Sequence, residues 1–141
     1  MTPRVTSLVV TLSSALLAAA LTGCGTPAPK QVTVTARSFG YEPASLEWHV
    51  GQPVRLRLRN PDAVEHDFVV DALKYTSAGD GHAAHGAAAG PTPSPDSLHI
   101  HAPAFGEGTL TLTPRSKGTY VVYCTIPGHK EAGMTARLVV G

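Results

Sequence analysis

Residues 54–59 read VRLRLR, a strict alternation of apolar and basic side chains. Successive side chains of an extended strand point to opposite faces, so Val54, Leu56 and Leu58 share one face and the arginines share the other. The segment therefore predicts a β-strand with one buried and one solvent-exposed face. Such a strand needs a second layer, because its apolar face must be buried against another element.

Similar short segments occur along the chain after residue 30. Residues 31–37 and 109–113 also alternate, and turn-forming residues separate the segments, as in the Pro-containing stretches 41–43, 51–53 and 60–62. Further strands are expected at 46–50, 64–70, 118–124 and 136–140. Because no helical periodicity persists after residue 30, about seven to eight strands predict an all-β fold, an antiparallel Greek-key β-sandwich.

The composition excludes several classes of protein. A chain of 141 residues suffices for one domain plus a targeting segment. Eleven Lys and Arg against ten Asp and Glu give a formal charge of +1, which argues against nucleic acid as a partner. The two cysteines form no CxxC pair, so neither a zinc ribbon nor a redox dithiol is expected.

The N-terminus has the pattern of an export signal. Residues 8–21 are mostly apolar and follow Arg4, and the run is shorter than the ~20 residues of a membrane-spanning helix. Residues 21–24 read LTGC, which resembles the bacterial lipobox. We therefore expect residues 1–23 to be a lipoprotein-type signal peptide and Cys24 to carry the lipid. The alternative is an ordinary signal peptide with a cysteine near its cleavage site.

This interpretation sets the domain organisation. Residues 24–30 are expected to form a tether, and residues 31–141 one domain. The expected location is the outer face of the cytoplasmic membrane, with the lipid as the membrane contact.

Residues 76–104 interrupt the pattern of strands. They are rich in Ala, Gly, Pro, Ser and His, which predicts a long mobile insertion of low complexity. Four histidines in it could bind a second metal ion, and the last two would point the same way on an extended chain. These histidines are His82, His85, His99 and His101. The alternative interpretation is a solvated loop without a metal.

The chemistry is concentrated in residues 124–134, which read CTIPGHKEAGM. Cys124, His129 and Met134 are separated by four residues each, and a strand, a Pro-Gly turn and a second strand would bring them together. His66 at the start of another strand would supply a fourth ligand. A thiolate and a thioether suit Cu(I), and imidazoles also bind Cu(II), so this ligand set favours copper for electron transfer. Zinc in the same site would leave Met134 without a role.

At these residues the chain resembles the cupredoxins, the blue-copper family of plastocyanin, azurin, auracyanin and sulfocyanin. The resemblance covers about residues 31–70 and 105–141, and the equal gaps are closer to auracyanin-type proteins. It implies a monomeric one-electron carrier, not an enzyme, that meets redox partner proteins transiently. It assigns one type 1 copper ion to His66, Cys124, His129 and Met134.

One position departs from the family pattern. Asp67 stands where cupredoxins commonly have Asn after the first His ligand. Its carboxylate could accept a hydrogen bond from the Thr125 hydroxyl, and its negative charge would lower the reduction potential. A second functional hypothesis is copper storage, buffering or delivery by means of the His-rich loop. Rapid electron self-exchange favours the carrier, and transfer of copper to an apo-acceptor favours delivery.

Overall fold

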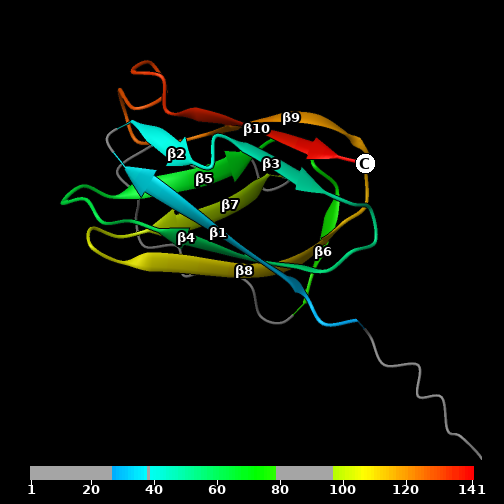
Figure 1. The fold of residues 1–141 in the computed structure, drawn as a ribbon. Helices are drawn as coiled ribbons and strands as arrows, with labels where there is room; N and C mark the ends of the chain where they lie inside the picture. The colour runs from blue at the N-terminus through cyan, green and yellow to red at the C-terminus, as the bar shows by residue number, and fades with distance from the viewer. Residues whose placement is uncertain (1–26, 38, 79–96) are drawn as a thin grey trace, which may run out of the picture.

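The computed structural model describes residues 27–37, 39–78 and 97–141 and forms two facing β-sheets (Figure 1). Residues in these ranges form ten strands and no helix, and so none of them lies in an apolar helix of membrane-spanning length. The strands are β1 (Lys30–Arg37), β2 (Gly40–Glu42), β3 (Ser45–Trp48), β4 (Val54–Arg59), β5 (His66–Val70), β6 (Tyr75–Ser77), β7 (Leu98–Ala102), β8 (Glu107–Pro114), β9 (Gly118–Tyr123) and β10 (Thr135–Val140).

The predicted all-β sandwich is confirmed. Sheet A has the order β2-β1-β4-β8-β6, and sheet B has the order β3-β10-β9-β5-β7. Both sheets are mixed rather than purely antiparallel, because β1 pairs with β4 and β3 pairs with β10 in parallel. A parallel pair cannot be joined by a hairpin. The connection from β1 to β4 is accordingly a crossover that passes through β3 in the other sheet.

The strand 54–59 has the two faces that its sequence predicts. Val54, Leu56 and Leu58 are fully buried, whereas the three arginines are exposed. The buried face of this strand packs against the inner side of sheet B, where Trp48 and Phe68 are among the largest buried side chains. On the outside, Arg57 Nε donates to Glu107 Oε2 on β8 at 2.8 Å.

The segment without strands between residues 76 and 104 is shorter than the sequence predicts, because strands occupy both of its ends. Its first residues belong to β6, and residues 98–102 form β7, which pairs with β5 along its whole length. The extension of the insertion to residue 104 was wrong because Leu98, Ile100 and Ala102 alternate with the half-buried His99 and His101 and bury one face of the strand in the core. His82 and His85 lie outside the described residues.

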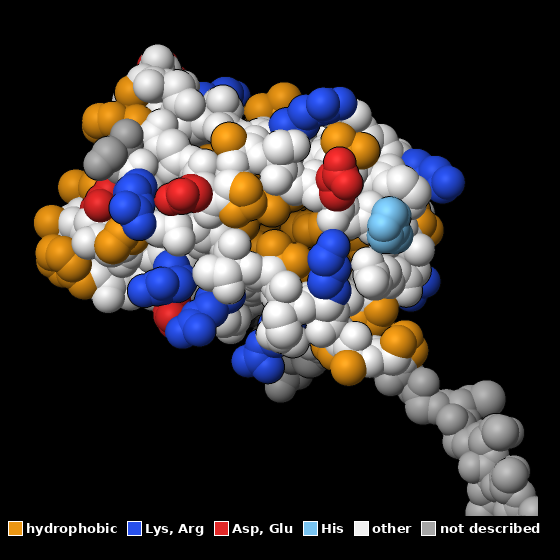
Figure 2. Space-filling view, viewed as in Figure 1, with side chains coloured by type: hydrophobic (Ala, Val, Ile, Leu, Met, Phe, Trp, Pro, Cys, Tyr) orange, Lys and Arg blue, Asp and Glu red, His pale blue; other side chains and the backbone are white. Residues whose placement is uncertain are grey.

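The visible surface carries charges of both signs. Lys and Arg side chains occur in separate groups with Asp and Glu side chains among them on the face shown in Figure 2. Apolar side chains are visible between these groups.

Candidate metal centre

Three predicted ligands meet at one end of the sandwich. One nitrogen of His66, the Sγ of Cys124 and one nitrogen of His129 all lie within 4.8 Å of one another. The Cys124 Sγ to His129 Nδ1 distance is 3.5 Å, and the two imidazole ring centroids are 5.1 Å apart. All three side chains are buried. Strand β5 supplies His66, while Cys124 follows β9 and His129 lies in the loop between β9 and β10.

His66 has one ring nitrogen without a protein partner. Its Nδ1 is buried and has no hydrogen-bond partner within the described part of the chain. Its Nε2 lies 3.3 Å from Asp62 Oδ2. A buried polar atom without a partner is costly unless another group satisfies it. A metal ion would satisfy it, and the carboxylate on the opposite nitrogen is the usual support of a metal-bound imidazole.

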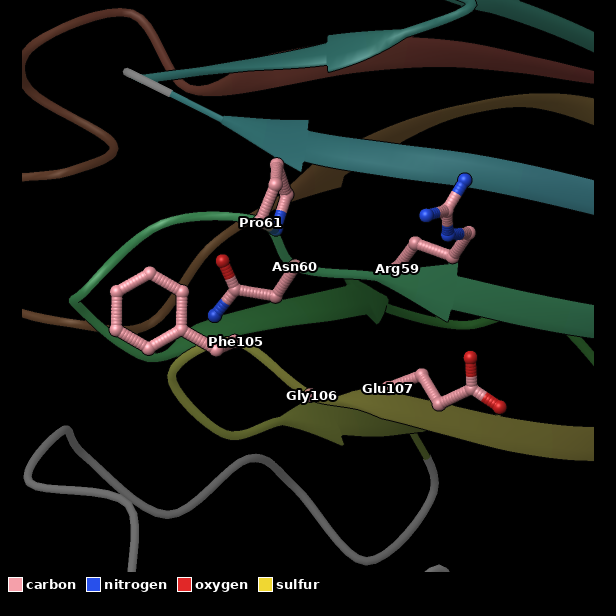
Figure 3. A pocket seen from close by; sticks show the side chains of 6 residues that line it. All are labelled: Arg59, Asn60, Pro61, Phe105, Gly106 and Glu107. Carbon is pink, nitrogen blue, oxygen red and sulfur yellow. The ribbon is translucent and has the colours of Figure 1, made fainter.

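The loop before His66 is held by Asn60, which is almost completely buried. Its side-chain amide donates to the carbonyl oxygens of Val64 at 2.7 Å and Pro103 at 2.9 Å. Its Oδ1 accepts from the Asp62 amide at 2.9 Å. Figure 3 shows Asn60 and Phe105 where this loop meets the turn before β8. Asn60 therefore fixes the segment from which Asp62 and His66 project.

The loop that carries the other ligands is closed by main-chain hydrogen bonds. The His129 amide donates to Ile126 at 3.1 Å, and the Met134 amide donates to the His129 carbonyl at 2.9 Å. Gly128 and Gly133 have φ values of 83° and 97°, a region that favours glycine. Met134 is fully buried at the end of this loop. A role for its sulfur as the fourth ligand stays a prediction.

Burial raises the pKa of the Cys124 thiol above its ordinary value, although backbone hydrogen bonds oppose this effect. One of these comes from the Asp67 amide, which donates to Cys124 Sγ at 3.3 Å. The thiol of the metal-free protein is therefore protonated at neutral pH. Metal binding must displace this proton, because the thiolate is the ligand form.

His129 lies beneath an aromatic side chain. Phe39 contacts its ring edge-on, with centroids 5.1 Å apart, and His129 is only 8% exposed. Little of the His129 side chain therefore reaches the surface. Burial lowers the pKa of His129, and the neighbouring His66 lowers it further. The imidazole is consequently neutral near pH 7 and available as a ligand.

The contact predicted between Asp67 and Thr125 is present. The Thr125 hydroxyl donates to Asp67 Oδ2, and the Tyr41 hydroxyl donates to the Asp67 carbonyl. Burial alone would raise the pKa of Asp67, but contacts with His99, Thr125 and His101 outweigh it and hold the pKa below its usual value. Asp67 is thus an ionised, fully buried carboxylate beside the ligand cluster.

A pocket of about 460 Å³ opens beside His66. Its lining includes Asp62 and three large, exposed apolar side chains, Phe39, Val64 and Phe105, which we call the apolar rim. Phe39 and Phe105 have φ values of 65° and 54°, uncommon for residues with a bulky side chain. The two aromatic rings are therefore held at the surface next to the ligand cluster in spite of an unfavourable backbone conformation.

The profile of the copper binding proteins, plastocyanin/azurin family, matches residues 28–141. The chain belongs to this family. Copper is accordingly the cofactor, and the cluster of two imidazoles and one thiol fits it.

Solved structures of auracyanins are similar to this fold. Auracyanin A from Chloroflexus aurantiacus is 26% identical with a TM-score of 0.61, over 81% of this chain and 100% of that chain. Auracyanin B is 28% identical with a TM-score of 0.59, over 82% of this chain and 91% of that chain. The predicted closeness to auracyanin-type proteins agrees with both.

The chain is also similar to a protein described as a copper-resistant cuproprotein. The copper-resistant cuproprotein CopI of Rubrivivax gelatinosus is 28% identical over 107 residues, which make up 76% of this chain. The match spans 63% of that protein's length.

Two residues near the site were not predicted from the sequence. Asp62 precedes His66 by four residues in a loop, and only the fold shows that its carboxylate faces the imidazole. Phe39 is more than 80 residues from His129 in sequence, and no pattern connects the two. A signal for Asp62 did exist, since carboxylates often support metal-bound histidines.

Proposed function

We propose that this protein is a one-electron carrier with a single type 1 copper site formed by His66, Cys124, His129 and Met134. The observation that carries the proposal is the buried cluster of two imidazoles and one thiol with an unsatisfied His66 nitrogen. Copper, when bound, supplies a Cu(I)/Cu(II) couple. The four side chains are each at most 8% exposed, so they offer almost no surface to a substrate.

The surrounding chain restrains these side chains. Main-chain hydrogen bonds close the 124–134 loop, Asn60 fixes the loop before His66, and the Asp67 amide holds the thiol. Ligands that cannot move far give similar geometry in both oxidation states, which keeps the reorganisation energy of electron transfer small. An arrangement of this kind suits a carrier rather than an enzyme.

We assign the docking of redox partner proteins to the apolar rim. Phe39 contacts His129 directly, and Phe39, Val64 and Phe105 are 49%, 51% and 74% exposed. A small apolar surface next to a ligand favours brief contacts, and a carrier must dissociate quickly. The protein would act as a monomer with partners that bind transiently.

The visible spectrum tests this function. One equivalent of Cu(II) should give the purified domain an intense thiolate-to-copper charge-transfer band, and Cys124→Ser should abolish it. A matched control is His49→Gln, since His49 is exposed and lies outside the site. A parent protein that binds copper without this band would contradict a type 1 centre.

A second candidate function is copper storage, buffering or delivery. It is favoured by the similarity to a copper-resistant cuproprotein. The two functions differ in one measurable property, the rate at which copper leaves the protein. Rapid transfer of copper to an apo-acceptor would support delivery, whereas fast electron self-exchange with slow copper loss would support the carrier.

We further propose that the protein is exported and anchored by a lipid on Cys24. The apolar run at residues 8–21 and the LTGC sequence support this proposal, and both lie outside the described residues. Membrane fractionation of the full chain tests it. The parent should sediment with membranes, and Cys24→Ala should not.

A further inference from the structure

A second group of polar side chains lies on the outer face of sheet B, next to the copper centre. His99 and His101 are on β7, which pairs with β5 so that His101 is opposite Asp67. His101 Nδ1 is 2.9 Å from Asp67 Oδ1, and His99 Nε2 is 3.2 Å from the same oxygen. The His99 and His101 side chains are only 11% and 9% exposed, so these contacts are shielded from water.

The contacts fix the Asp67 carboxylate in one orientation. An ionised carboxylate only accepts hydrogen bonds, so His101 Nδ1 acts as the donor to Oδ1. His99 Nε2 lies within ion-pair distance of the same oxygen. The other oxygen, Oδ2, accepts from the Thr125 hydroxyl. Since both oxygens are engaged from different elements, rotation of the carboxylate would break at least one contact.

Asp67 connects this network to the thiol. Its amide donates to Cys124 Sγ at 3.3 Å, and its side chain contacts Thr125, the residue after Cys124. A shift of Asp67 would therefore move a donor to the sulfur and a contact of the ligand loop together. Glu65 Oε2 lies 3.6 Å from His101 Nε2 and so orients His101 from its other side.

We propose that His99 and His101 are positioning residues of the copper centre, acting through Asp67 on Cys124 and Thr125. The inference rests on the copper site proposed above. Neither histidine joins the ligand group itself, since His66, Cys124 and His129 form the group of mutually close ligand atoms found in the described residues. The contacts to Asp67 also give these histidines a role that needs no second metal ion.

Two double variants and one single variant test the proposal. His99→Val/His101→Val removes both imidazole contacts to Asp67 and replaces them with a side chain that suits a strand. His99→Gln/His101→Asn keeps an N–H donor near each original nitrogen. His49→Val is the control for loss of an exposed histidine elsewhere.

Two readouts are measured for each variant. The first is the copper dissociation constant, obtained by chelator competition, together with the position of the charge-transfer band. The second uses the metal-free protein and follows the rate at which a thiol reagent modifies Cys124, which is 1% exposed in the parent.

The valine pair should weaken copper binding about tenfold or more, as loss of outer partners of metal sites generally does. It should also shift the band and accelerate thiol modification several-fold. The Gln/Asn pair and His49→Val should stay near the parent. In an Asp67→Ala background, the valine pair should add nothing to either readout.

The proposal is overturned if the valine pair matches the parent in both readouts, or if the Gln/Asn pair is as impaired as the valine pair. An additional loss in the Asp67→Ala background would overturn it as well. Failure of the parent to bind copper would refute the proposed function instead, and the thiol rates of the metal-free proteins would still decide the positioning role.

Discussion

The contact between Asp62 and His66 makes a quantitative prediction about copper affinity. We consider Asp62→Ala, which removes the carboxylate from His66 Nε2 and leaves the main-chain contact to Asn60 possible. Removing an outer partner of a metal ligand commonly costs about 10- to 100-fold in affinity. The 3.3 Å separation is slightly longer than an ordinary N–H···O bond, and the Asp62 side chain is 26% exposed.

Both features place the expected loss at the lower end of this range. We expect the copper dissociation constant to rise about tenfold, which corresponds to about 1.4 kcal/mol. The reduction potential should rise as well, because an imidazole without its carboxylate partner is less basic and stabilises Cu(II) less. Chelator competition measures the first quantity and equilibrium redox titration the second.

Asp62→Asn and Glu47→Ala complete the experiment. The amide of Asn keeps an acceptor oxygen but no charge, so its effect should be intermediate. Glu47 is an exposed carboxylate on β3, and its removal should change neither quantity. An Asp62→Ala protein whose affinity stays within twofold of the parent would show that the carboxylate does not support His66.

Three further predictions concern stability and access. Phe39→Gly relieves a left-handed backbone conformation worth about 1–2 kcal/mol and loses an aromatic contact worth about 0.5–1.5 kcal/mol. The free energy of unfolding in urea should therefore change by no more than about 1.5 kcal/mol, while His129 reacts faster with an imidazole reagent. Burial raises the pKa of Tyr41, and the charges of nearby acidic groups raise it further. Its neutral phenol therefore stabilises the fold fully below the unfolded pKa near 10, and stability should fall by about 1.4 kcal/mol per pH unit above it; a Tyr41→Phe protein that keeps this slope would contradict the assignment. A Cβ on Gly108 would lie 2.2 Å from the His101 carbonyl oxygen, so Gly108→Ala should lower the free energy of unfolding by about 2–3 kcal/mol, and an unchanged melting temperature would refute the close approach.

Much of the fold could be predicted because burial leaves a period of two in the sequence. Residues 54–59 form β4 as predicted, since every second side chain is apolar. The short strand β2 was not expected, because three residues are too few to show a period. Strand β7 does alternate, but its sequence follows an Ala, Gly and Pro-rich stretch that masks the pattern.

The site was predictable to the extent that its residues are close in sequence. The loop of Cys124 and His129 follows from spacing, and His66 from its place at a strand start, and the fold brings all three together. The contacts of Asp62 and Phe39 depend on how loops from sheet A pack beside sheet B. That packing is set by side chains such as Asn60, whose hydrogen bonds reach more than 40 residues along the chain.

The direction of β1 has a consequence for an anchored protein. The strand begins at Lys30 and ends at Arg37, close to the loops of the copper centre (Figure 1). Eight residues of strand span roughly 26 Å. If Cys24 anchors the chain and the copper centre carries electrons, as proposed above, this direction of β1 would present the copper centre outward from the bilayer. Its redox partners would then be soluble proteins or the protruding domains of membrane complexes.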